Sequence, residues 1–345
     1  MTDHEGSRTE PTRQRQSAAV LLEPVPLSRP TFLNVPRCED VQDLAALGAE
    51  VAVIGVPFGM HYDMLASRET AATGPAAIRE QSLRFVQSLG HYDYDFGGPT
   101  LADRAPVIVD CGDVAMTPGD YAGNAAATTA AINAIIDAGV VPVVFGGSHA
   151  VTIPVMAAYA GRAPLGVVQL DAHIDFRDEV DGNRDGWSSP MRRAIELDSV
   201  TGLTQIGLRS VGSARQEEVD LAHELGVVQI TARELHAEGA EAALARVPQA
   251  ERFYITIDAD GFDPTLAPAV GVPSFGGITY QEAVTLLQGL AQRGQIVGYD
   301  FVVVSPGLDI GHRTAYLAAR LTYVLIGALA HSGQIGGGTR IGASA

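Results

Sequence analysis

The stretch Leu165–Asp175, LGVVQLDAHID, decides the fold, because a short apolar run there ends abruptly in acids and a histidine. Other short runs rich in β-branched residues recur along the chain. Together the eight runs are Val51–Pro57, Val107–Asp113, Val140–Gly147, Leu165–His173, Leu203–Arg209, Val227–Thr231, Phe253–Asp260 and Ile296–Val304. Runs that are apolar on both faces are typical of strands in a buried parallel sheet.

Longer stretches rich in Ala and Leu lie between these runs and have the composition of helices. They are Pro75–Leu89, Gly119–Ala138, Gln216–Leu225, Tyr280–Arg293 and Thr314–Ala330. Strands that alternate with helices predict an α/β protein with three layers, αβα, around a central, mostly parallel sheet. A sheet of this kind places functional residues at the carboxyl ends of its strands.

Length and charge narrow the possibilities further. The chain has 345 residues and a formal net charge of −17, and all 23 basic residues are arginine. Without lysine there is no Schiff-base chemistry and no P-loop lysine. The acidic excess argues against partners such as nucleic acid or an anionic membrane surface. No linker-like composition interrupts residues 35–330, which predicts a single domain over residues 31–345, preceded by a flexible arm over residues 1–30.

The ends and the cysteines indicate a compartment. Cys38 and Cys111 are too few for a disulfide framework or a zinc cluster and are expected to be reduced thiols. The N-terminus lacks the basic start and apolar core of a signal peptide, and no apolar run is long enough to cross a bilayer. We therefore expect a soluble protein of the cytoplasm.

Three segments at the ends of apolar runs are rich in metal-ligand side chains. They are Gly146–His149, Asp171–Asp175 and Asp258–Asp260. In an extended strand alternate residues share a face, so Asp171, His173 and Asp175 should point the same way. Four buried carboxylates would cost several kcal/mol each unless cations neutralise them. Two imidazoles and four carboxylates therefore predict a carboxylate-bridged pair of divalent metals.

With these segments the chain resembles the ureohydrolase family of arginases and agmatinases, which has an arginase-like fold. The resemblance is agmatinase-like and runs from Val51 to about Ala330. Beyond the metal segments it includes the motifs IGVPF (Ile54–Phe58), GPAAIR (Gly74–Arg79), DCGD (Asp110–Asp113), PMRRA (Pro190–Ala194), QIGLR (Gln205–Arg209) and GGITYQE (Gly276–Glu282).

The resemblance implies a role for each candidate residue. It implies one metal on His149 and Asp175, a second on His173 and Asp260, bridges through Asp171 and Asp258, and a substrate guanidinium on Glu282. Two divalent cations, Ni²⁺ or Mn²⁺, would lower the pKa of a bridging water enough to supply hydroxide at neutral pH. Attack on the guanidinium carbon, with Asp175 passing a proton to the departing amine, would release urea or a substituted urea.

Departures from the family pattern fall around the pocket. Trp187, Ser188 and Ser189 stand where agmatinase-like sequences carry His-Gly-Thr. Ser274–Gly277 replaces Glu-Pro-Gly-Gly, and Val303–Pro306 replaces Glu-Val-Asn-Pro. The arginine-rich motif expected after Phe58 is also absent. We name Trp187, Ser188 and Ser274 as substrate-pocket candidates, since an indole face can bind a cation. A less polar pocket suits guanidine, an N-alkylguanidine or a biguanide such as metformin, as in the guanidine and metformin hydrolase branch.

Two alternatives remain open. The first is an agmatinase or guanidino-acid hydrolase, of guanidinobutyrase type, in which Arg177 or Arg184 binds a substrate carboxylate. The second is a non-catalytic partner subunit that stabilises an active homologue, which the missing histidine favours. The resemblance implies a homo-trimer or hexamer, or a hetero-oligomer with a homologous subunit.

Overall fold

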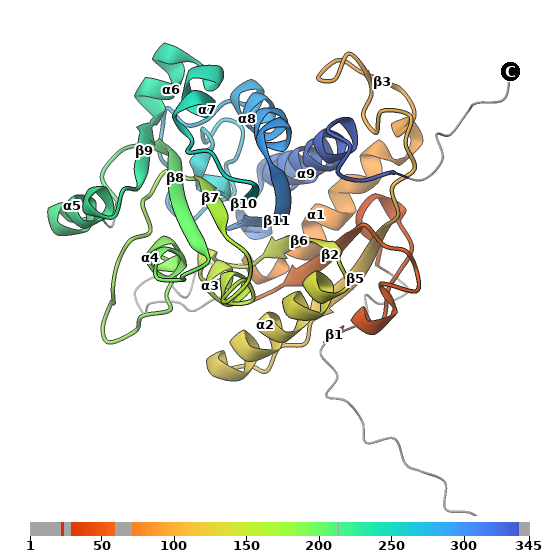
Figure 1. The fold of residues 1–345 in the computed structure, drawn as a ribbon, viewed down its shortest axis with the longest axis horizontal. Coiled ribbons are helices and arrows are strands. Elements are labelled where there is room, and N and C mark those ends of the chain that lie inside the picture. Colours follow the sequence, from red (N-terminus) through yellow and green to blue (C-terminus); the bar gives the residue numbers. More distant parts are fainter. Residues whose placement is uncertain (1–21, 24–28, 59–70, 213, 338–345) are drawn as a thin grey trace, which may run out of the picture.

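A computed structural model describes residues 22–23, 29–58, 71–212 and 214–337 (Figure 1). Its centre is a nine-stranded sheet in the order β1-β5-β2-β6-β11-β10-β7-β8-β9. Only the short edge strand β1, Leu22–Glu23, runs antiparallel within this described sheet. The expectation of a mostly parallel sheet is confirmed.

All eight predicted runs form strands of this sheet. The strands are β2 (Val51–Val56), β5 (Ile108–Val114), β6 (Val141–Gly146), β7 (Leu165–Leu170), β8 (Val200–Leu208), β9 (Val228–Thr231), β10 (Arg252–Asp258) and β11 (Gln295–Val302). Strand β10 lies between β7 and β11, and β11 pairs in turn with β6. This order brings the carboxyl ends of β6, β7 and β10 into one region of the sheet edge.

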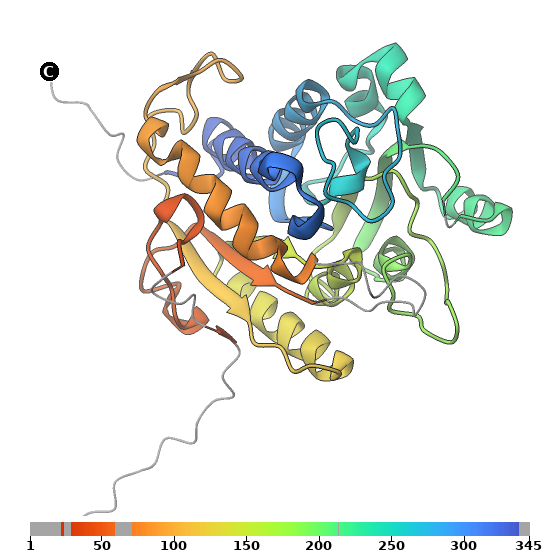
Figure 2. The same cartoon turned by 180° about the vertical axis from the view of Figure 1, so that it is seen from behind.

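Helices cover both faces of the sheet, which confirms the three layers (Figures 1 and 2). One layer packs its apolar side chains into the larger core and contains α1 (Gly74–Ser82), α6 (Ala232–Glu238), α7 (Ala240–Arg246), α8 (Tyr280–Arg293) and α9 (Arg313–His331). The other layer contains α2 (Tyr121–Asp137), α3 (Thr152–Ala157), α4 (Pro190–Ile195) and α5 (Gln216–Glu224). The five predicted helical stretches are all helical, although Pro75–Leu89 changes to a 3₁₀ helix after Ser82.

The elements that the pattern did not predict are short. They are several 3₁₀ helices of three residues, β1, the hairpin of β3 (Tyr92–Asp93) and β4 (Gly98–Pro99), and the helices α3, α4, α6 and α7, none of which exceeds seven residues. Two turns of helix give too few repeats for a recognisable period. Most of the predicted arm, residues 1–30, lies outside the described residues, as does the segment 59–70 that follows Phe58. No helix in the described ranges is long and apolar enough to cross a membrane.

Candidate metal centre

His149 follows the end of β6 and opens a short 3₁₀ helix, η5 (His149–Val151). The chain passes close to the backbone of Phe58 there because residue 147 is glycine. A Cβ on Gly147 would lie 2.1 Å from the carbonyl oxygen of Phe58, so any larger residue would displace that backbone. The turn leaves the His149 side chain buried, with 1% of its surface exposed.

The segment Asp171–Asp175 brings its side chains to the same place by a route different from the predicted one. Strand β7 ends at Leu170, so the expected alternation along an extended strand is wrong for these residues. Asp175 has a left-handed backbone, with φ of 46°. Its carbonyl accepts hydrogen bonds from Met191 and Arg192 at the start of α4. The turn is therefore fixed by contacts with a helix that begins 15 residues later.

Asp258 is the last residue of β10, and Asp260 lies in the 3₁₀ helix η6 (Ala259–Gly261). Asp258 Oδ1 accepts the N–H of Asp260 at 2.8 Å, which holds the two carboxylates together. Gly261 allows close approach to the neighbouring segment, because a Cβ there would lie 2.9 Å from Asp171 Cα. The Ala172 N–H donates to Asp260 Oδ1 across the same gap at 3.3 Å.

The side chains form two groups that share Asp171. In the first, His149 Nδ1 lies 3.1 Å from Asp171, 2.7 Å from Asp175 and 3.4 Å from Asp258. In the second, His173 Nδ1 lies 3.5 Å from Asp171 and 3.1 Å from Asp260. Ligand atoms of His149, Asp171 and Asp258 all lie within 4.8 Å of one another, as do those of Asp171, His173 and Asp260. The fold thus brings all six predicted ligands together.

Burial perturbs the protonation of these groups strongly. Burial, together with the charges of Asp260 and Asp171, raises the pKa of Asp258 well above its usual range. Burial and the neighbouring Asp171 raise the pKa of Asp175 to about 6. Burial alone would lower the pKa of His173, but Asp171 and Asp260 outweigh it and raise that pKa to about 12. The cluster therefore holds more negative charge than its own histidines can neutralise.

The donor set fits divalent metals. Among the described residues, His149 Nδ1 is buried without a hydrogen bond of good geometry, although three carboxylate oxygens surround it. A buried ring nitrogen that faces only carboxylates is placed as a metal ligand would be. Carboxylate oxygen and imidazole nitrogen accept manganese, nickel and similar ions.

The other ring nitrogen of His149 belongs to a buried series of hydrogen bonds. His149 Nε2 lies 3.1 Å from Thr256 Oγ1, and the Thr256 hydroxyl donates to Asp300 Oδ1 at 2.5 Å. Asp300 also accepts from the hydroxyls of Tyr254 and Thr152. Asp300 is fully buried in β11, and the sequence pattern gave no sign of its role. Such contacts fix the orientation of a metal-ligating imidazole.

A row of glutamines on three adjacent strands holds Asp171 in a similar way. Gln229 on β9 donates to Gln205 on β8 at 2.9 Å, and Gln205 donates to Gln169 on β7 at 2.6 Å. The row ends where Gln169 Nε2 donates to Asp171 Oδ2 at 2.6 Å. Hydrogen bonds from side chains of the sheet thereby orient the Asp171 carboxylate, which both groups share.

Arg209 closes the edge of the site beside Asp260. Its guanidinium donates to the main-chain carbonyls of Asp260, Gly261 and Phe262, and also to that of Ser274. The candidate Ser274 is buried and contacts Arg209 through its carbonyl. Arg209 belongs to a motif in the sequence, but nothing in that motif showed this bracing of the loop that follows β10.

Glu282 lies at the start of α8, in the first turn. Its Oε2 accepts the N–H and the hydroxyl of Thr279, which caps the helix. Its Oε1 lies 2.8 Å from Nδ1 of His236, a residue of α6 that the sequence did not single out. No pattern could have found His236, because α6 itself was not predicted.

The remaining pocket candidates lie along the segment that follows Asp175. The Arg177 N–H donates to the carbonyl of Ser188, which is buried, whereas Trp187 is half-buried. Val303, which stands where the family has an acid, follows β11 with a left-handed φ of 64°. A β-branched residue in this region is strained, and such strain concentrates at functional sites.

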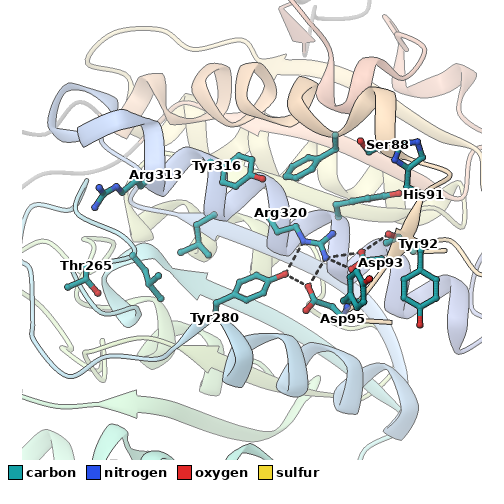
Figure 3. Close-up of a pocket in the computed structure, with 16 residues that line it drawn as sticks. Ser88, His91, Tyr92, Asp93, Asp95, Thr265, Tyr280, Arg313, Tyr316 and Arg320 are labelled. Carbon is teal, nitrogen blue, oxygen red and sulfur yellow. Dashed lines mark hydrogen bonds and ion pairs between the residues drawn. The ribbon is translucent and has the colours of Figure 1, made fainter. Parts of the chain in front are cut away.

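Two cavities differ in their relation to the metal candidates. One of about 250 Å³ is lined by His173, Arg209, Gln229 and Thr231, among others. Another, of about 850 Å³, lies between α8, α9 and the β3–β4 hairpin and contains none of the six candidate ligands (Figure 3). In this aromatic cavity Arg320 pairs with Asp93 and Asp95 and donates to the Tyr280 hydroxyl at 2.9 Å.

Taken together, the parallel sheet and the two carboxylate–histidine groups at its edge are those of a metal-dependent hydrolase with an αβα fold. Residues 49–327 match the model of the Arginase family. The chain therefore belongs to the arginase family and is an agmatinase-like ureohydrolase, an enzyme that hydrolyses guanidino groups. Members of this family depend on a binuclear manganese centre, which agrees with the candidate ligands described above.

Curated relatives and solved structures support this assignment. The guanidinopropionase of Pseudomonas aeruginosa is 35% identical over 316 residues, which cover 88% of this chain and 92% of the relative. The guanidinobutyrase of the same organism is 28% identical, with coverage of 86% and 91%. The structure of proclavaminate amidino hydrolase from Streptomyces clavuligerus matches with a TM-score of 0.76 and 29% identity, over 88% of this chain and 97% of that one. The arginase-like fold is thus confirmed.

Proposed function

We propose that this chain is a binuclear metal-dependent hydrolase of a small guanidino compound: guanidine, an N-alkylguanidine or a biguanide such as metformin. The observation that carries the metal assignment is the pair of groups that share Asp171. His149 and Asp175 would hold one ion, His173 and Asp260 the other, with Asp171 and Asp258 as bridges. The ions are Mn²⁺ or Ni²⁺, since this donor set accepts both.

In the reaction, the metal pair supplies hydroxide at neutral pH when it is bound. The chain contributes the groups that hold the substrate and move protons. Glu282 binds the guanidinium through Oε1, because Thr279 already holds Oε2. Asp175, 2.7 Å from His149, passes a proton to the departing amine. The products are urea, or a substituted urea, and an amine or ammonia.

The preference for a small substrate rests on the charges around the site. The two arginines that could bind a substrate carboxylate are paired with acids: Arg177 with Glu218 at 3.0 Å and Arg184 with Asp178 at 3.0 Å. Ser274 and Val303 also stand where the family carries acids that could bind an ammonium group.

A guanidino-acid hydrolase is the second candidate. The observation that favours it is the 35% identity to guanidinopropionase. In that case an arginine would have to leave its acidic partner, Glu218 or Asp178, to bind the substrate carboxylate.

The decisive test is a substrate panel. The purified chain is loaded with Mn²⁺ or with Ni²⁺, and release of urea and amine is measured with guanidine, methylguanidine, metformin, agmatine, 3-guanidinopropionate and 4-guanidinobutyrate. We expect the highest kcat/KM with guanidine, methylguanidine or metformin, which carry neither a distal ammonium nor a carboxylate group. Turnover of agmatine or of a guanidino acid alone would refute the small-substrate proposal. No turnover with both metals bound would favour a partner subunit without activity of its own.

Glu282→Gln tests the substrate contact separately from the metal site. Loss of the carboxylate charge should raise KM for the guanidinium at least tenfold. This corresponds to a loss of about 1.4 kcal/mol in binding free energy. The metal content should stay unchanged. An unaltered KM would refute the assignment of Glu282.

We further propose that residues 31–345 form one catalytic domain and that the protein acts in the cytoplasm as a homo-trimer or hexamer, or together with a homologous subunit. Size-exclusion chromatography with light scattering of the purified chain decides the oligomeric state. A monomer that is fully active would contradict it.

A further inference from the structure

His236 makes contacts that link α6 to Glu282, the residue proposed to bind the guanidinium of the substrate. Its Nδ1 lies 2.8 Å from Glu282 Oε1, and its Nε2 lies 3.2 Å from the carbonyl oxygen of Gly276. The side chain is 37% exposed, whereas that of Glu282 is 15% exposed. Both ring nitrogens therefore face oxygen atoms, and the ring remains within reach of solvent protons.

The protonation of His236 follows from these partners. A carbonyl oxygen and a carboxylate oxygen only accept hydrogen bonds, so both ring nitrogens must donate to satisfy both contacts. Burial would lower the pKa of His236, but the hydrogen bond to Glu282 outweighs it and raises that pKa above its ordinary value. The geometry thus favours the imidazolium form next to the Glu282 carboxylate.

The other charges around His236 do not change this balance. Arg209, at the end of β8, opposes the positive charge on the ring. Asp263 lies behind the Gly276 peptide, whose N–H it accepts at 2.9 Å. On α6 itself, Glu234 is engaged by Thr231 and by Arg246 of α7. Glu282 is therefore the acid that the ring contacts directly.

The contacts also leave little room on Glu282. A carboxylate has about four lone-pair positions. Thr279 occupies two of them on Oε2, and His236 occupies one on Oε1. A single position on Oε1 remains for a substrate N–H, and its direction is set by the imidazole.

We infer that His236 is a positioning residue of the substrate site, which orients Glu282 Oε1 and partly neutralises the charge that the guanidinium meets. The inference rests on the proposed role of Glu282. While His236 is protonated, the pair has no net charge, and a guanidinium cation gains little from it. Once His236 loses its proton, the pair becomes an anion and attracts the cation.

The sign of the pH dependence follows directly. Guanidinium stays charged throughout the range used, so only the site changes. Affinity for guanidinium should increase as the pH rises through the pKa of His236, by about fivefold, the size expected for a partly exposed ion pair. The direction is the opposite of that expected if the imidazole helped to bind an anion.

The first experiment is independent of turnover. NMR titration of the metal-free protein with labelled histidine should give His236 a pKa above the ordinary value of a histidine side chain. Glu282→Gln should lower the pKa of His236. If Glu282→Gln leaves the titration of His236 unaltered, the two side chains are not paired and the inference is wrong.

The second experiment measures binding of guanidinium chloride to the metal-loaded protein by calorimetry, from pH 6 to pH 9. His236→Asn keeps a donor near the position of Nδ1 and carries no charge. We expect it to bind guanidinium about fivefold more tightly than the wild type at low pH and to lose the dependence on pH. His236→Ala should bind more weakly than His236→Asn, because Oε1 is no longer oriented.

His223→Asn is the matched control and should behave as the wild type. An affinity whose pH dependence persists in His236→Asn would overturn the inference. Failure of the proposed function and failure of this inference can be distinguished, because calorimetry measures binding and not turnover. If no compound of the panel is hydrolysed, the proposed function fails. The titration and the calorimetry still decide the role of His236.

Discussion

Two buried groups of carboxylates lie at the sheet, and they are neutralised in different ways. On β5, Asp110 and Asp113 pair with Arg79 of α1 at 2.8 and 2.6 Å, and Arg79 is 2% exposed. At the ends of β7 and β10, four aspartates meet only the histidines 149 and 173 among the ion pairs of the described residues. The first group is complete within the chain, whereas the second needs cations from outside.

This difference separates a structural site from a functional one. The Asp110 oxygens accept from Arg79 and from the N–H groups of Phe32 and Gly112, so the cluster fastens the N-terminal segment and α1 to the sheet. In the second cluster a buried imidazole nitrogen is left without a hydrogen bond among the described residues. Removal of a charge should therefore affect stability in the first cluster and metal binding in the second.

The largest effect is expected for Asp258→Asn. Loss of a bridging carboxylate should abolish metal loading and activity together, because neither ion keeps a complete set of ligands. Metal content by elemental analysis and kcat with the preferred substrate provide the measurement. Asp263→Asn, a change at a half-buried acid that follows η6, is the control. Full activity in Asp258→Asn would refute the bridging assignment.

Arg79→Met should have its effect on stability. It leaves Asp110 buried without a cation, which costs about 3–5 kcal/mol in the free energy of unfolding. Urea denaturation of the metal-free protein measures this change. Arg184→Met removes a pair whose side chains are 54% and 57% exposed, and should cost less than about 1 kcal/mol. Equal losses in the two variants would contradict the comparison.

Asp300→Asn should weaken metal binding without abolishing it. The amide disturbs the hydrogen bonds through Thr256 that orient His149. Disturbance of such contacts lowers metal affinity by about 10- to 100-fold. Competition with a chelator gives the dissociation constant. Thr256→Ser keeps the hydroxyl and should behave as the wild type. A loss of folding without a change in metal affinity would show that Asp300 serves only the core.

The smallest effect is a release of protons. Burial would lower the pKa of both histidines, but the aspartates raise it, to about 12 for His173, so the metal-free protein holds both protons at neutral pH. Loading of the two ions must expel them, together with any proton held by Asp258, so at least two protons are released and affinity should increase with pH. Calorimetry in buffers of different ionisation enthalpy measures the number. The absence of proton release would contradict this charge state.

The same shift predicts the stability of the metal-free protein. A group with a raised pKa in the folded state stabilises most below its unfolded pKa, near 6.5 for histidine, and the contribution disappears as the pH rises through the folded value. Stability without metal should therefore decrease above neutral pH. The metal-loaded protein should not show this decrease. Thermal unfolding with and without metal from pH 6 to pH 9 checks the prediction.

Local signals in the sequence predicted much of this architecture. The eight apolar runs became strands, and Thr279 and Glu282 of GGITYQE form the cap that starts α8. Convergence of the metal candidates followed from their positions after parallel strands, a rule that needs no knowledge of the side chains.

Other features could not be predicted because they depend on packing between distant segments. The turn at Asp175 is set by the start of α4, and the contact between His236 of α6 and Glu282 of α8 joins two residues that are 46 positions apart. Asp300 and Thr256 lie inside strands, where a polar side chain gives no periodic signal. The sequence therefore predicted which residues are the candidate ligands, but not the contacts that orient them.

The order of the strands has a consequence for folding. His149 and Thr256 are 107 residues apart in the chain, and Ala172 and Asp260 are 88 apart, yet each pair is in contact. Bringing such distant segments together carries a large entropic cost of loop closure. Metal ions held between β6, β7 and β10 would therefore act as a cross-link, comparable to a disulfide, and would tie the refolding rate of the sheet to the supply of metal.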